Sequence, residues 1–84
     1  MIPNYNNKRI SMAAIRFVCY TNNKASHDEV KRKLFFAGGA ITREKVRDLG
    51  SGYTSELEMI CEGPTLYREL KDSELCVKVS LLDI

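Results

Sequence analysis

Several features that would point to a function are scarce or missing in this chain of 84 residues. It has no tryptophan, two prolines and a single histidine. No apolar run approaches the roughly 20 residues that span a bilayer as a helix. The first ten residues lack the apolar core of a signal peptide, so we expect a cytoplasmic protein. The net charge is only +2, so the total charge predicts no strong field toward nucleic acid.

Cysteine is also scarce: the three residues are Cys19, Cys61 and Cys76. The odd number and the wide spacing indicate neither a metal knuckle nor a disulfide framework. We therefore interpret all three as small apolar residues and expect no pair to bridge, with Cys76 on the opposite face of the sheet from Cys19. The sequence predicts no metal and no cofactor.

What is present is typical of one small soluble domain. Hydrophobic residues make up 44% of the chain and charged residues 29%. Residues 1–11 are polar and rich in asparagine, which predicts a flexible N-terminal arm. Residues 12–84 then form a single domain.

Hydrophobic periodicity divides this domain into four strands and two helices. Alternation predicts strands at 12–21, 40–49, 53–62 and 74–83. The first helix starts with a capping box at Ser26-His-Asp-Glu29 and ends at Gly38-Gly39. Its predicted buried stripe consists of Val30, Leu34 and Phe35. The second helix opens with Pro64 at its first position and buries Leu66 and Leu70.

The segment 42–49 has two interpretations. A two-residue turn at Ser51-Gly52 would make it a strand of a hairpin. The facing pairs would then be Arg47 with Glu56, Lys45 with Glu58 and Val46 with Leu57. Alternatively 42–49 is a helix, and residues 26–49 become a helix-turn-helix with a basic second helix. We favour the strand.

The order strand, helix, strand, strand, helix, strand predicts an α+β fold. It is the βαββαβ plan of a ferredoxin-like sandwich, with an antiparallel sheet of order 4-1-3-2 and both helices on one face. One edge of this sheet would carry many charges, which discourages pairing with another strand. The other edge has one charge in the eight residues 75–82 and is a candidate for strand addition or homodimer formation. Its predicted partner residues are Leu75, Val77, Lys78, Val79, Ser80, Leu81 and Leu82.

A second candidate surface is basic. The ordinary mode, in which RNA bases stack on aromatic residues of the two central strands, is not expected, because the third strand has Glu58 and Ile60 at the positions that correspond to Tyr20 of the first. A cationic cluster can still contact an RNA backbone. Its members are Lys31, Arg32, Lys33, Arg43, Lys45 and Arg47.

Catalytic residues are not predicted. His27 lies in the first turn of a helix, and the spacing supplies neither a nucleophile nor an orienting group. We interpret it as a solvent-facing histidine. An enzyme would need chemistry from a partner or a subunit interface.

One stretch carries a family resemblance. Gly38-Gly39-Ala40-Ile41 followed by Leu49-Gly50 resembles the sixth protein of the bacterial and mitochondrial small ribosomal subunit, and the order of elements over residues 12–83 is similar. The resemblance implies a ferredoxin-like fold, binding to ribosomal RNA and a neighbouring protein partner. The chain lacks that family's Leu-Ala-Tyr-like segment, so no RNA contact is assigned to a residue from it.

Two functions follow from the sequence. The first is a non-enzymatic binding or regulatory module that acts through protein contact at the fourth strand, such as a small inhibitor of the kind that phages encode. The second is an RNA-binding protein that uses the basic helix and hairpin.

Overall fold

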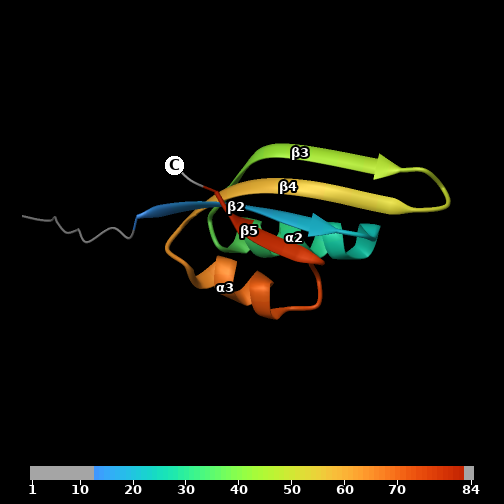
Figure 1. The fold of residues 1–84 in the computed structure, drawn as a ribbon. Helices are drawn as coiled ribbons and strands as arrows, with labels where there is room; N and C mark the ends of the chain where they lie inside the picture. The colour runs from blue at the N-terminus through green and yellow to red at the C-terminus, as the bar shows by residue number, and fades with distance from the viewer. Residues whose placement is uncertain (1–12, 83–84) are drawn as a thin grey trace, which may run out of the picture.

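The structure, a computed structural model, describes residues 13–82. Its elements follow one another as two strand–helix–strand units (Figure 1). In chain order they are β2 (Ala14–Thr21), α2 (Lys24–Phe36), β3 (Ala40–Asp48), β4 (Tyr53–Glu62), α3 (Thr65–Asp72) and β5 (Lys78–Leu81). The predicted arm at 1–11 and the last two residues lie outside the described part of the chain.

The four strands form one antiparallel sheet with the order β3-β4-β2-β5. Both helices lie on the same side of it (Figure 1). The predicted α+β class is therefore confirmed. β2 is central because it pairs with β4 on one side and β5 on the other, which leaves β3 and β5 as the two edges.

The core lies between the sheet and the helices. Every second residue of β2 and β4 points toward the helices, and the apolar stripes of α2 and α3 meet them there. Phe17, Leu57 and Met59 are fully buried, each worth roughly 1.5–3 kcal/mol of transfer free energy. The whole core comprises Phe17, Cys19, Val30, Leu34, Leu57, Met59, Cys61, Leu66 and Leu70.

α2 begins earlier than the sequence predicted. The Asn23 side chain is the N-cap and accepts a hydrogen bond of 2.7 Å from the Ser26 amide, so the predicted capping box at Ser26 is wrong. His27, Val30 and Leu34 are spaced to share one face of α2, and all three are buried. Phe35, predicted to be buried, is 78% exposed because it lies about 100° around the helix from Leu34.

α2 ends against β4 at a position that only glycine fits. A Cβ atom on Gly39 would stand 2.4 Å from Leu34 Cδ1 and 2.8 Å from the Ile60 carbonyl oxygen. The backbone can therefore turn from helix into β3 in direct contact with the neighbouring strand.

β3 and β4 form the hairpin that the sequence favoured, and the alternative helix at 42–49 is wrong. The predicted register is also wrong, by two residues. The turn spans four residues, Leu49–Gly52, with Gly50 at φ +80° and its amide hydrogen-bonded to the Asp48 carboxylate at 3.2 Å. The facing pairs are Arg43 with Glu58, Lys45 with Glu56 and Arg47 with Thr54.

β5 has four residues where the sequence predicted ten, 74–83, and its start is irregular. Lys78 is the register partner of Tyr20, yet the Val77 amide also donates to the Tyr20 carbonyl at 2.8 Å. Val77 and Lys78 thus both stand opposite Tyr20, as at a β-bulge. Residues before Lys78 therefore have their side chains on the opposite side of the sheet from the side that regular alternation would give.

This irregularity corrects the cysteine prediction. Because alternation reverses before β5, Cys76 lies on the same side of the sheet as Cys19, and the two form a disulfide with Cα atoms 6.1 Å apart. Cys61 is a buried free thiol. None of the helices within residues 13–82 is long and apolar enough to cross a membrane.

Candidate functional site

The side of the sheet that faces away from the helices is the first of two candidate surfaces. We call it the open face. By strand alternation it carries Arg16, Val18 and Tyr20 from β2, Arg43, Lys45 and Arg47 from β3, Thr54, Glu56, Glu58 and Ile60 from β4, and Lys78 and Ser80 from β5.

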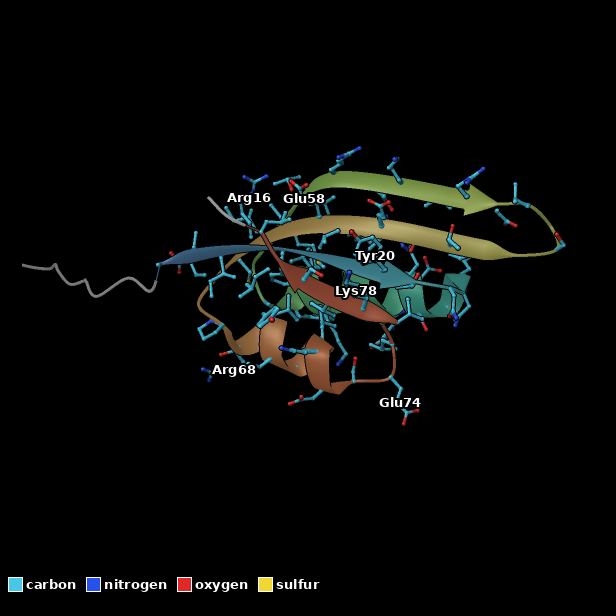
Figure 2. The ribbon with its side chains drawn as sticks, viewed as in Figure 1. Arg16, Tyr20, Glu58, Arg68, Glu74 and Lys78 are labelled. Atoms are coloured by element: carbon cyan, nitrogen blue, oxygen red, sulfur yellow. A yellow bond between two sulfur atoms is a disulfide. The ribbon has the colours of Figure 1, made fainter. Side chains whose placement is uncertain are left out.

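One row of side chains crosses all four strands of this face. Lys45 faces Glu56, Glu56 faces Tyr20, and Tyr20 faces Lys78. The Lys78 ammonium lies over the Tyr20 ring, 5.9 Å from its centroid (Figure 2). Cations therefore stand at both edges of the sheet, with an aromatic ring between them.

The six cations that the sequence grouped together fall into two sets of three. Those of α2 lie in the helix layer, where each has a carboxylate partner. The ion pairs are Lys31 with Glu44 at 3.1 Å, Arg32 with Glu29 at 3.6 Å and Lys33 with Glu69 at 2.6 Å. Their charge is largely compensated within the fold.

The other three cations are on the open face and lack such partners. Arg43, Lys45 and Arg47 alternate along β3, so their Cα atoms are spaced by roughly 6.8 Å. Within residues 13–82, no carboxylate oxygen comes within 4.0 Å of a side-chain nitrogen of these three or of Lys78. All four side chains are exposed and available to an anion.

The carboxylates of the open face are only partly free. Glu58 lies beside Arg16 (Figure 2) and pairs with it at 2.7 Å. It also accepts a hydrogen bond of 2.8 Å from the Thr42 hydroxyl. Both hydrogen bonds lower the pKa of Glu58, and the one from Arg16 has the larger effect. Glu58 is thus a neutralised anion, whereas Glu56, the register partner of Lys45, has no ion pair within residues 13–82.

The open face is hollowed near the end of β2. A cavity of about 480 Å³ has Tyr20, Val77 and Lys78 on one side and Lys45, Arg47 and Thr54 on the other. Its remaining lining residues are Thr21, Asn22, Ser55 and Glu56. The sequence predicted Lys45, Arg47, Val77 and Lys78 as site residues, but in two separate surfaces, whereas the fold brings all four to this cavity.

The second candidate surface is the outer edge of β5. Leu75 and Cys76 precede the strand, and Val79 packs against the core. The Leu82 amide donates to the Arg16 carbonyl at 2.9 Å, so alternation points the Ser80 backbone groups toward β2 and those of Val79 and Leu81 outward. Leu81 is 56% exposed. The usable edge is therefore four residues long rather than eight.

His27 lies in a polar cluster that the sequence did not predict. It is 4% exposed rather than solvent-facing. Its Nδ1 lies 2.8 Å from Ser55 Oγ and its Nε2 lies 2.6 Å from Glu44 Oε2. Thr21 extends the chain of hydrogen bonds with its hydroxyl 2.5 Å from that of Ser55. The spacing of 27, 30 and 34 is the one signal that could have placed this histidine on the buried stripe.

The cluster has the residue types of a catalytic triad but not an accessible nucleophile. Ser55 is 4% exposed and Thr21 is 2% exposed, so neither hydroxyl is exposed enough to attack a substrate carbonyl. The hydrogen bond from His27 links the edge strand β3 to α2. The same hydrogen bond lowers the pKa of Glu44. Within residues 13–82, no group of three or more His, Cys, Asp or Glu side chains could hold a metal ion.

Comparison with known proteins identifies no family. No protein-family model matches the chain, and no curated protein matches it. One solved structure with a similar fold is described as "GqqA- a novel type of quorum quenching acylases"; it is 21% identical, with a TM-score of 0.55. The match covers 82% of this chain and 27% of that chain. At this identity the likeness shows the fold alone.

Proposed function

We propose that this protein is a non-enzymatic binding module that contacts the phosphate backbone of RNA with the open face of its sheet. The observation that carries the proposal is the contrast between the two sets of cations. Arg43, Lys45 and Arg47 have no carboxylate within 4.0 Å among the described residues, whereas the α2 residues Lys31, Arg32 and Lys33 are each paired. Unpaired surface cations gain most from a phosphate, because they release no internal partner.

The fold is compatible with this use. We also infer a ferredoxin-like sandwich, which the strand order β5-β2-β4-β3 and the position of both helices on one side support. In such a sandwich the helices cover one side of the sheet and leave the other free for a ligand. The row from Lys45 to Lys78 then crosses the whole free side.

The test compares two triple variants for binding to a labelled oligouridine of about 12 nucleotides. In the first, Arg43, Lys45 and Arg47 are changed to glutamine. We expect its affinity to fall about tenfold or more at low salt, and the slope of log affinity against log salt to become shallower by about 2, because three phosphate contacts are lost. Fluorescence anisotropy at several salt concentrations measures both quantities.

The matched control changes Lys31, Arg32 and Lys33 to glutamine. It removes the same charge from the chain, but from residues that already have partners. We expect less than about a threefold change in affinity. Equal losses in the two triples would mean that net charge alone drives binding, and absence of binding by the wild type at low salt would refute the proposal.

The outer edge of β5 supports a second candidate function, contact with a protein partner or a second copy of the chain by strand addition. The supporting observation is that the amide groups of Val79 and Leu81 point outward beside the exposed Leu81 side chain. A regulator or inhibitor that binds in this way would need only a short extended segment on its partner.

A proline at Leu81 tests this candidate. Leu81→Pro removes an outward amide donor, whereas Leu81→Ala removes the same side chain and keeps the donor. Against peptides selected from a displayed library for binding to the wild type, we expect loss of binding for the proline variant and retention for the alanine variant. Equal binding by both variants would exclude strand addition at this edge.

A further inference from the structure

The cavity on the open face has one apolar wall, which a site for phosphate alone does not need. Tyr20 supplies an aromatic ring from β2, and Val77 supplies an aliphatic side chain that is 63% exposed. Val77 reaches this wall only because of the irregularity before β5, which puts two consecutive residues opposite Tyr20. An exposed valine beside a tyrosine in a hollow is a suitable surface for a flat ring.

Polar and cationic groups surround this wall. Lys45 and Arg47 reach the cavity from β3, and Lys78 reaches it from β5. Asn22 and Thr54 add neutral hydrogen-bonding groups, which can read the edge of a base. Glu56 is the single carboxylate of the lining, and its register partner Lys45 stands beside it. The cavity therefore combines an excess of positive charge with an apolar surface and neutral hydrogen-bonding groups.

We propose that this cavity binds one unstacked nucleotide of a single-stranded RNA, with the base against Tyr20 and Val77 and the adjoining phosphates at Lys45, Arg47 and Lys78. The inference rests on the proposed RNA-binding function and adds the form of RNA that is recognised. A duplex keeps its bases paired and stacked, so it can meet the cations but cannot place a base in the cavity.

The position of Lys78 fits this assignment. Its ammonium group lies over the Tyr20 ring, 5.9 Å from the centroid, so a base on that face displaces the ammonium from the ring and leaves it beside the phosphate of the same nucleotide. Binding at this point would engage both edges of the sheet, because Lys45 and Arg47 belong to β3 and Lys78 to β5.

The first experiment compares two aromatic-to-leucine variants. Tyr20→Leu removes the ring of the cavity, and Phe36→Leu removes a ring that is 80% exposed on α2 in the helix layer. With labelled oligouridine we expect Tyr20→Leu to lose about tenfold in affinity and Phe36→Leu to bind like the wild type. We also expect a duplex of equal length to bind the wild type about tenfold more weakly than the single strand at the same salt concentration.

A second measurement does not depend on loss of binding. The chain has no tryptophan, so Tyr20→Trp introduces a single indole fluorophore. Titration with oligouridine should quench its emission, whereas titration with the duplex or with inorganic phosphate should not. Circular dichroism of each variant checks that the fold is retained.

The outcomes separate the two proposals. Equal binding of single strand and duplex, equal affinity of the Tyr20→Leu and Phe36→Leu variants, or no quenching of Tyr20→Trp would each overturn the nucleotide site. The loss of affinity in the Arg43, Lys45 and Arg47 triple would then still support backbone contact. Failure of every RNA form to bind at low salt would refute both.

Discussion

Replacement of Cys76 by serine should destabilise the protein by about 4 kcal/mol. The disulfide joins residues 57 apart in the sequence, and closing a loop of that size lowers the entropy of the unfolded chain by an amount worth about 4 kcal/mol at 25 °C. A domain of 84 residues has a total stability of only roughly 4–13 kcal/mol, so this one bond is a large part of it. Urea denaturation of the two proteins measures the difference.

Two controls accompany this prediction. Cys61→Ala removes the free thiol and leaves the disulfide intact. We expect this variant to lose no more than about 1–2 kcal/mol of stability. Dithiothreitol added to the wild type should lower its unfolding midpoint toward that of the Cys76→Ser variant. If the unfolding curve of the wild type were the same with and without reductant, the disulfide would not contribute to stability in solution.

Replacement of His27 by alanine should cost about 2–4 kcal/mol. The ring is 4% exposed and contacts Ser55 through one nitrogen and Glu44 through the other. Its removal takes one of two hydrogen-bond partners from Ser55, which keeps Thr21, and from Glu44, which keeps Lys31, and it opens a space on the buried face of α2. Thermal or chemical denaturation at neutral pH measures the loss. A variant within about 0.5 kcal/mol of the wild type would contradict a stabilising role for the cluster.

The same cluster gives the protein a pH dependence of known sign. The hydrogen bond from His27 lowers the pKa of Glu44 from its ordinary value of 4.5. A carboxyl with a lowered pKa in the folded state stabilises the fold above its ordinary pKa, and this contribution disappears as the pH falls through the lowered value. Glu44→Gln keeps an acceptor for His27 but cannot titrate, so its stability should vary less with pH in this acidic range.

The sequence predicted an element correctly where one periodic pattern alone defines it. Leu57, Met59 and Cys61 alternate with charged or aliphatic neighbours, and β4 has the predicted bounds, 53–62. The predicted hairpin register was wrong because charge pairing and turn glycines are each compatible with two registers. Glutamates stand at both 56 and 58, so Lys45 faces a carboxylate in either register, and glycines at both 50 and 52 permit either turn.

The candidate site could be predicted only in part. Alternation along residues 43–47 places three cations on one face, and this part follows from the sequence. Their lack of carboxylate partners depends on how α2 packs, because Glu44 turns toward His27 and Lys31 on the other side of β3. Cys76 and Val77 could not be placed, since alternation contains no signal for the extra residue opposite Tyr20.

The central position of β2 has a consequence for how the chain acquires its structure during synthesis. Phe17 pairs with Met59 on one side and with Leu81 on the other, so β2 must wait for partners that emerge more than 40 residues later. The β3–β4 hairpin is the only sheet contact between described strands that are adjacent in the sequence. We expect this hairpin and α2 to form early, and the sheet to be completed only after β5 has emerged from the ribosome.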